Sequence, residues 1–159
     1  MSPSARTALP QAFFLPSDNG QRFCLYHPPQ GSPPQGRVLY LHPFAEELNS
    51  TRRTAAQQAR ALAQAGYAVL QIDLLGCGDS SGDFADATWA AWLQDAQQAR
   101  RWLMAHGSGP LWLWGIRAGA LLAAQLAQQP QESGDPTHLL LWPPVACGQQ
   151  QLLQFLRLQ

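Results

Sequence analysis

The sequence contains no lysine, no excess of charge of either sign and no long apolar run. Its ten basic residues are all arginine and balance ten acidic residues, so the formal net charge is zero. A basic field is what attracts nucleic acids and acidic membranes, so we expect no nucleic-acid partner. The most apolar segment, residues 111–127, is interrupted by Arg117 and is shorter than the ~20 residues that cross a bilayer. We therefore expect no membrane span.

Cysteine is also scarce in this chain. The three cysteines, Cys24, Cys77 and Cys147, are too few and too scattered for a disulfide framework or a zinc site. The N-terminal segment lacks the continuous apolar stretch of a signal peptide. We predict a cytoplasmic protein with no metal and no other cofactor. With 159 residues, 46% of them hydrophobic, the chain is long enough for one domain with a sizeable core.

The N-terminal part of the sequence predicts a β-hairpin. Residues 12–15 and 22–27 are short strand candidates, and Asp18-Asn19-Gly20-Gln21 lies between them. Asn-Gly supplies the positive φ values of a tight turn, which favours antiparallel pairing of the two strands. Residues 28–36 are rich in proline, glycine and glutamine, a composition typical of a loop.

From residue 37 onward, strand patterns alternate with helix patterns. The predicted strands are residues 38–41, 67–72, 111–114 and 138–142, and the predicted helices are residues 49–65, 86–106, 117–128 and 149–158. A hairpin followed by repeated β-α units predicts an α/β fold with a mostly parallel sheet and helices on both faces.

Capping residues and apolar periodicity define the first two of these helices. Asn49 or Ser50 is the expected N-cap of the first helix, and Asp86 is the expected N-cap of the second. We interpret the apolar residues at helical spacing in the second helix as a core-facing stripe rather than a ligand platform. The members of this stripe are Trp89, Trp92, Leu93, Ala96 and Leu103.

The most distinctive motif joins strand 111–114 to the helix after it. Gly115 and Gly119 occupy the glycine positions of Gly-x-Ser-x-Gly, the nucleophile elbow of α/β-hydrolases, where a strained turn leaves no room for side chains beside the nucleophile. The motif predicts a sheet of the α/β-hydrolase type. Arg117 stands at the serine position, and a guanidinium stays protonated and has no lone pair with which to attack. Serine-type acyl transfer is therefore excluded at this position.

A second loop of interest follows strand 38–41 and begins with His42-Pro43-Phe44. In α/β-hydrolases, a backbone N–H of this loop and the N–H of the residue after the nucleophile form the oxyanion hole. Proline has no N–H, so the expected backbone donors are Phe44 and Ala118. His42 would then orient the loop rather than act as a base. The alternative is a plain turn that contains a histidine.

The third loop, residues 73–83, follows strand 67–72 and is rich in glycine, aspartate and serine. Glycines let the chain turn sharply, and the Asp and Ser side chains can bond its backbone groups. The loop resembles the Gly-x-Gly-Asp-Ser segment of α/β-hydrolases related to serine peptidases and thioesterases, where that segment is chiefly structural. Asp79 and Ser80, with His42, are weak candidates for catalytic side chains. Cys77 has no histidine near it in sequence, which disfavours a catalytic thiol.

The rest of a catalytic triad does not follow the elbow in this sequence. The acid and the histidine are expected in late loops, but the histidine after Arg117, His138, starts a predicted strand. A complete α/β-hydrolase core also has further strands. We therefore expect residues 1–159 to be a single domain that is truncated or naturally short. A homo-oligomer or a missing C-terminal segment is expected to cover the sheet edge after Trp142.

Four segments resemble the exosortase A system-associated hydrolase 2 family, an α/β-hydrolase group of bacteria that make exopolysaccharide and sort proteins with a PEP-type C-terminal signal. These segments are LYLHPFAEELNSTRR, DLLGCGDSSGDF, LWLWGIRAGALLA and LLWPPVACGQQQLLQFLR, and the resemblance covers residues 12–158. Members of that family also carry arginine at the elbow. The resemblance therefore implies that Arg117 is a family trait. It also implies a hydrolase, but only on the basis of the fold and the genomic context of the family.

Three functional hypotheses follow from these residues. In the first, Arg117 at a helix N-terminus binds a small anionic ligand such as a phosphate or a carboxylate, without catalysis. In the second, the protein hydrolyses an ester, a thioester or a phosphorylated substrate with water activated by Asp79. In the third, Arg117 is structural and its head group is bonded to Asp79 or Glu46.

Overall fold

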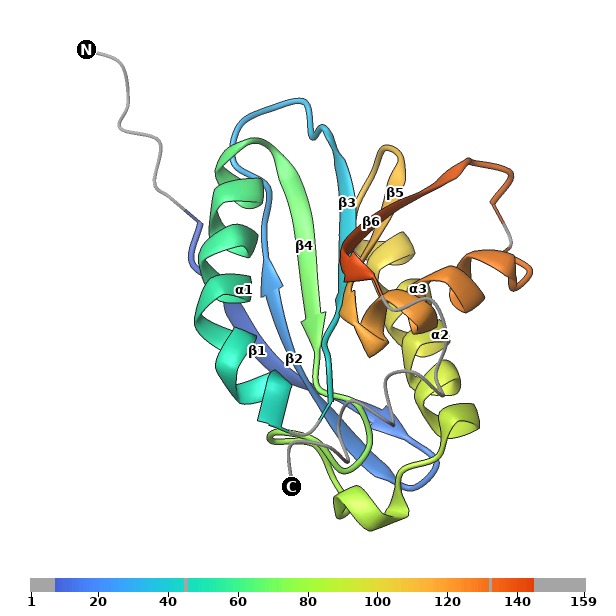
Figure 1. The fold of residues 1–159 in the computed structure, drawn as a ribbon. Helices are drawn as coiled ribbons and strands as arrows, with labels where there is room; N and C mark the ends of the chain where they lie inside the picture. Colours follow the sequence, from blue (N-terminus) through green and yellow to red (C-terminus); the bar gives the residue numbers. More distant parts are fainter. Residues whose placement is uncertain (1–7, 45, 132, 145–159) are drawn as a thin grey trace.

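A six-stranded sheet runs through the molecule and carries three α-helices among the described residues (Figure 1). The computed structural model describes residues 8–44, 46–131 and 133–144. The strands are β1 (Gln11–Ser17), β2 (Gly20–His27), β3 (Gly36–Leu41), β4 (Tyr67–Ile72), β5 (Leu111–Arg117) and β6 (Thr137–Pro144). The helices are α1 (Glu46–Gln64), α2 (Trp89–His106) and α3 (Ala118–Gln128), with a 3₁₀ turn, η1 (Phe84–Asp86), before α2.

The order of strands across the sheet is β1-β2-β4-β3-β5-β6. β2 pairs antiparallel with both β1 and β4, whereas β4, β3, β5 and β6 are parallel to one another. The predicted hairpin and the predicted mostly parallel sheet are thus confirmed. One detail of the turn differs, because Gly20 has a positive φ of 114° and Asn19 does not. Gly20 pairs with Ser17 and closes the turn, so one flexible residue is sufficient there.

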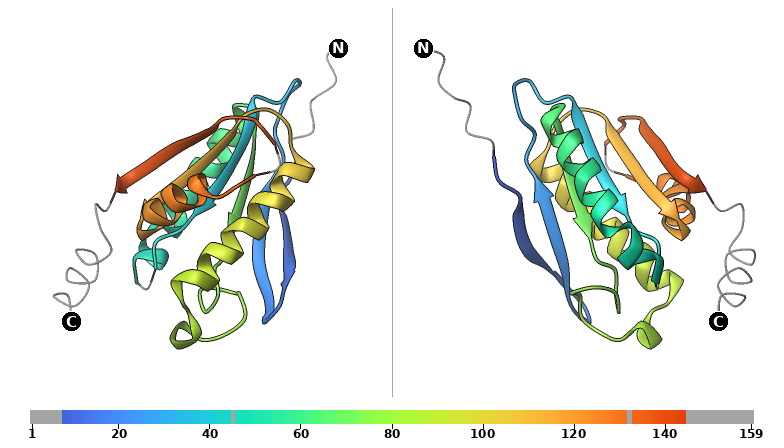
Figure 2. Two further views of the ribbon diagram at one scale, coloured as in Figure 1. Left: turned by 90° about the vertical axis from the view of Figure 1, so that its right-hand side faces the viewer. Right: turned by 60° about the vertical axis from the view of Figure 1, so that its left-hand side comes forward.

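The helices form two layers, with α1 on one face of the sheet and α2 and α3 on the other (Figure 2). β3 is buried along its whole length because it lies in the middle of the parallel strands. Its side chains alternate between the layers: Leu39 and Leu41 join the core under α2 and α3, while Val38 and Tyr40 join the core under α1. The expectation of helices on both faces is therefore confirmed.

The first helix begins earlier than its capping pattern predicts. α1 starts at Glu46, so Asn49 and Ser50 lie inside the helix and the prediction of an N-cap at either residue was wrong. The Ser50 hydroxyl instead donates to the carbonyl of Glu47 at 3.1 Å. A hydroxyl bonded back to the preceding turn is compatible with a helix interior, which is why the serine does not interrupt the helix.

The N-cap of α2 is Thr88, not Asp86 as the sequence predicts. The Thr88 hydroxyl oxygen accepts from the backbone N–H of Ala91 at 3.1 Å. Asp86 belongs to η1, and its carboxylate accepts from the backbone N–H of Asp83 at 2.8 Å. Both residue types are good caps, and the extra 3₁₀ turn moves the start of the helix two residues along the chain.

The apolar stripe of α2 faces the core for most of its length. Trp92, Ala96 and Leu103 are buried, but Trp89 is 38% exposed, so its assignment to the core was wrong. Trp89 occupies the first position of α2, and its indole N–H donates to the side chain of Gln125 on α3. A side chain at the first position of a helix can extend beyond the core that the middle of the helix covers.

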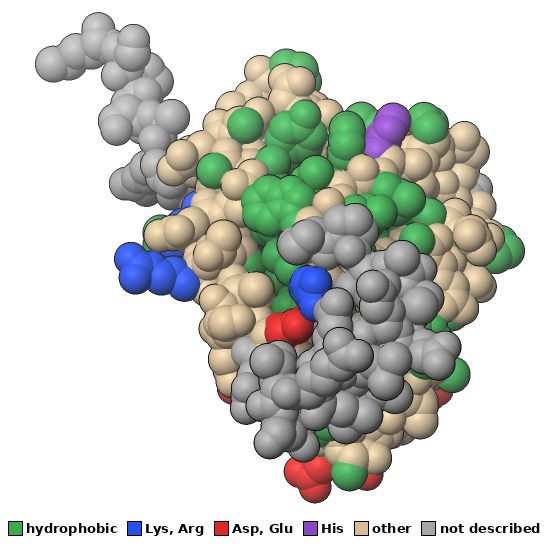
Figure 3. Space-filling model, viewed as in Figure 1, with side chains coloured by type: hydrophobic (Ala, Val, Ile, Leu, Met, Phe, Trp, Pro, Cys, Tyr) green, Lys and Arg blue, Asp and Glu red, His purple; other side chains and the backbone are tan. Residues whose placement is uncertain are grey.

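Hydrophobic side chains gather on the face of the molecule between α1 and β6 (Figure 3). A shallow groove of about 150 Å³ lies there, lined by Val38, Leu62, Tyr67, Trp112 and Leu140. The predicted helix 149–158 lies outside the described residues. The domain extent and the partner expected at the sheet edge stay predictions.

Candidate functional site

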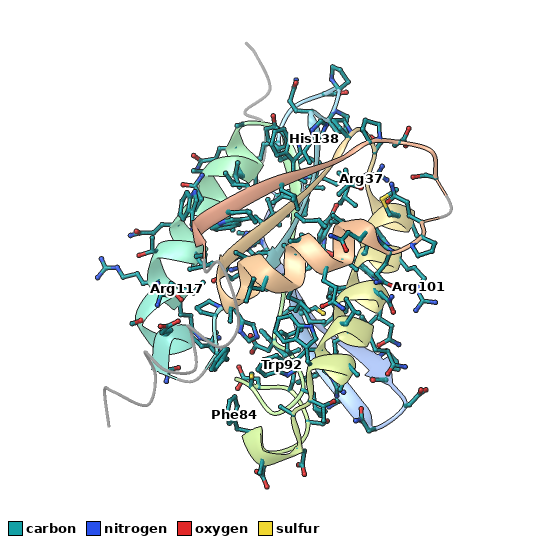
Figure 4. The ribbon with its side chains drawn as sticks, turned by 45° about the vertical axis from the view of Figure 1, so that its right-hand side comes forward. Arg37, Phe84, Trp92, Arg101, Arg117 and His138 are labelled. Carbon is teal, nitrogen blue, oxygen red and sulfur yellow. The ribbon has the colours of Figure 1, made fainter. Side chains whose placement is uncertain are left out.

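The turn between β5 and α3 has the geometry of a nucleophile elbow. Arg117 has φ 56° and ψ −117°, and it is the one non-glycine residue with positive φ in the described ranges. For an arginine, this backbone conformation costs roughly 1–3 kcal/mol of strain energy. The surrounding packing must therefore impose the turn. Figure 4 shows Arg117 where this turn begins α3.

The two elbow glycines explain how the packing imposes that turn. A Cβ on Gly115 would lie 2.3 Å from the carbonyl oxygen of Gly119, and a Cβ on Gly119 would lie 2.1 Å from the carbonyl oxygen of Leu41. Both obstructing atoms belong to the backbone, so neither can move aside. The first turn of α3 is thus pressed against the end of β3. This close approach brings the elbow and the loop after β3 together.

His42 begins that loop and is almost fully buried. One ring nitrogen, Nδ1, lies 2.5 Å from the carbonyl oxygen of Pro43, and Nε2 lies 3.0 Å from the backbone nitrogen of Leu74. Because Nε2 accepts from an N–H, Nδ1 carries the proton and the ring is neutral. Burial lowers the pKa of His42 below its usual 6.5. Both nitrogens are occupied by backbone groups, and the ring ties the loop after β3 to the loop after β4.

Phe44 and Ala118 are the residues expected to supply oxyanion-type backbone donors. Ala118 is the first residue of α3, where an N–H has no partner within the helix. The ring of Phe44 lies 5.8 Å from that of Trp92 and 6.1 Å from that of Phe84, between ring centroids. Their role as a donor pair stays a prediction.

The glycine-rich loop after β4 is held by its own serine and aspartate side chains. The Ser80 hydroxyl donates to the carbonyl of Asp73 and accepts from the backbone N–H of Phe23. The Asp73 carboxylate accepts from the backbone N–H of Asp79 at 3.0 Å and lies 3.6 Å from the Arg52 guanidinium. The Asp79 side chain is exposed. These bonds give Ser80 a structural environment and leave the Asp79 carboxylate in solvent.

Cys77 lies in the same loop and is buried. Burial raises the pKa of its thiol to about 11, and the carboxylates of Asp73 and Asp95 add to this effect. A nucleophilic cysteine needs the opposite shift, because the thiolate is the attacking species. The environment of Cys77 therefore supports the interpretation of an inert thiol.

Arg117 makes an ion pair with Glu47, in the first turn of α1. The guanidinium Nε lies 3.5 Å from a Glu47 carboxylate oxygen, and both side chains are about 30% exposed (28% and 30%). Glu47 was not among the acidic partners predicted from the sequence, which were Asp79 and Glu46. The available signal was the adjacent Glu46-Glu47 pair, but one residue along a helix changes the direction of a side chain by about 100°. The start of α1 therefore decides that the Glu47 side chain reaches the elbow.

An aromatic cluster lies at the same end of the molecule as the elbow. Figure 4 shows Trp92 and Phe84 low in the view, below the level of Arg117. The rings of Phe84 and Trp92 are 6.1 Å apart, and those of Trp89 and Trp92 are 6.3 Å apart. Phe84 is 47% exposed, so the cluster reaches the surface. Sequence reasoning missed Phe84 because a single phenylalanine in a polar loop has no periodicity to mark it.

Two further features bear on the chemistry of the described residues. No group of three or more His, Cys, Asp or Glu side chains in residues 8–44, 46–131 and 133–144 is arranged to hold a metal ion. None of the described helices is long and apolar enough to cross a membrane.

The elbow, with its strand, strained central residue and helix, is the structural signature shared with known hydrolases. The family described as serine aminopeptidase S33 matches residues 32–158. The chain belongs to this family. The match includes the elbow and the loops after β3 and β4, and it confirms the superfamily that the sequence motifs predict.

Individual relatives agree with the family assignment. Human protein ABHD12B is 30% identical over 105 residues, which are 65% of this chain and 28% of the relative. Lysophosphatidylserine lipase ABHD12 of Danio rerio is 30% identical over 105 residues, again 65% of this chain and 26% of the relative. The chain spans about a quarter of the length of these two relatives (28% and 26%).

Solved structures show the same fold. A thermostable carboxyl esterase from Bacillus coagulans superposes with a TM-score of 0.67 and 20% identity, covering 85% of this chain and 44% of the esterase. A serine hydrolase without a lid from Xanthomonas campestris has a TM-score of 0.64 and 20% identity, covering 94% of this chain and 79% of that protein. At this identity the likeness establishes the α/β-hydrolase fold, as predicted.

Proposed function

We propose that this protein is a non-classical member of its hydrolase family that binds an anionic amphipathic ligand at the elbow. The single observation that carries the proposal is Arg117, which holds a guanidinium in the position and strained conformation of the family's nucleophile. A guanidinium cannot attack a carbonyl carbon, but it binds phosphate and carboxylate groups well.

The position of Arg117 strengthens its attraction for an anion. The residue immediately precedes α3, where free N–H groups and the helix dipole favour negative charge. Its pair with Glu47 is partly exposed and 3.5 Å long, so that contact is weak. An incoming phosphate or carboxylate would compete with Glu47 for the guanidinium.

The aromatic cluster would bind the apolar part of such a ligand. Phe44 belongs to the loop after β3, which contacts the elbow. The ring of Phe84 lies 6.1 Å from that of Phe44, and Phe84 is 47% exposed. The name of one relative, a lysophosphatidylserine lipase, describes a substrate with an anionic head and an acyl chain. We extend this ligand class to the present chain, including the prenyl phosphates of polysaccharide synthesis. The link to exosortase A and exopolysaccharide systems belongs to the proposal and comes from the sequence resemblance.

The second candidate is hydrolysis with water activated by Asp79. It is favoured by the exposed carboxylate and by the family to which the chain belongs. It is disfavoured by His42, since both ring nitrogens are bonded to backbone groups and cannot accept a proton from that water.

Binding of decyl phosphate, with octyl glucoside as the uncharged control, tests the proposal. We expect Arg117→Gln to weaken decyl phosphate binding about tenfold, because a charge-assisted hydrogen bond contributes about 1.5–3 kcal/mol. Arg53→Gln, an exposed arginine on α1, is the matched control and should leave binding unchanged. Equal binding by wild type and Arg117→Gln would overturn the proposal.

The other two hypotheses give distinct outcomes in the same set of proteins. Turnover of p-nitrophenyl esters that disappears in Asp79→Asn would establish the hydrolytic mechanism and overturn the binding role. A lower melting temperature of Arg117→Gln with no ligand effect would assign the arginine a structural role.

A further inference from the structure

A pocket of about 710 Å³ lies at the end of the molecule opposite the elbow. It opens where α2 and α3 end and where β3 begins, beside the loop between α3 and β6. We call it the arginine pocket, and its lining includes Arg37, Arg100, Arg101, Met104, Pro130 and Ser133. Figure 4 shows Arg37 and Arg101 on the side of the molecule away from Arg117.

Arg37 is fixed in the wall of this pocket. It is the second residue of β3 and only 5% exposed. Its guanidinium donates to the carbonyls of Met104 at 3.1 Å, Gly107 at 3.3 Å and Gly109 at 2.6 Å. These bonds use three of the five N–H donors of an arginine. The Nε atom is buried and has no hydrogen-bond partner.

Arg100 is held in a similar way at the end of the neighbouring helix. It is also 5% exposed, and it donates to the carbonyls of Leu126 at 3.0 Å and Pro130 at 2.8 Å. Two of its five donors are thus used. Both arginines stabilise the carboxyl end of a helix, where carbonyl groups carry partial negative charge. Carbonyl dipoles compensate a full positive charge only in part.

The positive charge of the pocket has no matched carboxylate in the described part of the chain. No Asp or Glu oxygen described by the structure lies within 4.0 Å of a nitrogen of Arg37, Arg100 or Arg101. Among the described residues that line the pocket, three are arginines and one, Asp135, carries a carboxylate. Burial lowers the pKa of Arg100, and repulsion from the neighbouring Arg101 lowers it further.

Unpaired polar atoms give an independent sign of a missing ligand. Besides Arg37 Nε, the hydroxyl of Ser133 and the amide oxygen of Gln131 are buried without a partner in the described structure. Buried donors in native proteins are nearly always satisfied, by protein, water or a bound group. All three residues line the same pocket, and two of the three atoms are hydrogen-bond donors.

We propose that the arginine pocket binds the phosphate group of a small phosphorylated molecule. Guanidinium groups pair with phosphate oxygens through two parallel N–H bonds, and the unused donors of Arg37, Arg100 and Ser133 match such an acceptor. The volume exceeds that of a phosphate ion, and the side chains of Met104 and Pro130 provide apolar wall for the rest of the ligand. The site is separate from the elbow and does not depend on the function proposed there.

Phenyl phosphate is the probe for this proposal, titrated into Arg117→Gln protein so that the elbow arginine cannot contribute. Arg101 is exposed and makes no hydrogen bond to the described structure, so its charge can be reversed without loss of the fold. We expect Arg101→Glu in this background to weaken binding about tenfold, since it replaces attraction by repulsion. Arg53→Glu, on α1 across the sheet, has the same net charge and should change binding less than twofold.

These measurements distinguish specific binding of phosphate in the arginine pocket from a general effect of the protein's net charge. Equal weakening by the two charge reversals, or no binding of phenyl phosphate to Arg117→Gln protein, would overturn the proposal and leave Arg37 and Arg100 as helix caps. Ser133→Ala is the second variant, and a two- to threefold loss with unchanged melting temperature supports a direct hydrogen bond to the ligand.

Discussion

The buried ion pair between Arg22 on β2 and Asp95 on α2 offers the sharpest test of how the fold is held together. The Arg22 Nε lies 2.9 Å from Asp95 Oδ2, and the two side chains are 1% and 2% exposed. The same carboxylate oxygen accepts from the backbone N–H of Leu75 at 2.9 Å. One carboxylate therefore joins a strand, a helix and the glycine-rich loop. Asp95→Ala removes both of these interactions at once.

The expected cost follows from what the substitution leaves behind. Removing one partner of a buried pair costs about 3–5 kcal/mol, because the other charge remains buried and uncompensated. The orphaned N–H of Leu75 adds about 1–3 kcal/mol. Arg22 keeps its bonds to Asn19 and to the carbonyl of Gln21, which offset part of this loss. We expect a net loss of about 4 kcal/mol, a large share of the 5–15 kcal/mol that stabilises a typical domain.

Urea unfolding followed by tryptophan fluorescence measures this loss. The informative comparison is Arg22→Met/Asp95→Leu, which replaces both charges by apolar side chains of similar volume. We expect the double variant to be at least about 2 kcal/mol more stable than Asp95→Ala, because no unpaired charge stays buried. A loss below about 1 kcal/mol for Asp95→Ala at unchanged m-value would refute the reasoning. So would a double variant as unstable as the single one.

Three further predictions concern the residues around the elbow. Burial holds the pKa of His42 below 6.5 in the folded state, so the unfolded chain binds its proton first and stability falls as the pH drops below 6.5. Wild type should therefore lose about 1 kcal/mol more than His42→Gln between pH 8 and pH 5.5, as measured by urea unfolding. Gly119→Ala should cost more than about 3 kcal/mol, since the new Cβ meets backbone oxygen at 2.1 Å, whereas Gly134→Ala has open space and should be neutral. Cys77, with its pKa raised to about 11, should resist iodoacetamide at pH 8 in folded Cys147→Ser protein.

Each of these expectations has a contrary result. Parallel pH profiles of wild type and the His42 variant would show that the ring titrates freely. A stable, folded Gly119→Ala protein would show that the end of β3 can retreat from α3. Rapid labelling of Cys77, located by peptide mass spectrometry, would show an accessible thiolate.

Local chemistry made much of the site predictable. The glycines at 115 and 119 predict the elbow because that turn has no space for a Cβ, and the structure shows backbone oxygens where each Cβ would lie. Pro43 excludes an N–H donor by its covalent structure alone. The prediction that Arg117 cannot be a nucleophile depends only on the guanidinium group. Each of these inferences concerns a property of the residue itself or of its immediate neighbours.

Predictions that depended on distances between segments were less successful. Glu47 makes an ion pair with Arg117 that the sequence did not predict, because the start of α1 sets the direction of its side chain. Trp89 fits the apolar period of α2 but is 38% exposed, because it occupies the first position of the helix and its indole N–H donates to Gln125 of α3.

The sequence by itself determined the order of strands and helices, the elbow and the loss of its nucleophile. Apolar periods, glycine positions and side-chain chemistry are local, and they act in the same way in any fold that contains them. Only the tertiary structure decided that both nitrogens of His42 bond backbone groups and that three arginines line one pocket. Arg37 and Arg100 are far apart along the chain, and the ends of two helices and a strand bring them together. No local sequence pattern predicts that these arginines lie close together, because their proximity depends on how all the elements pack around one sheet.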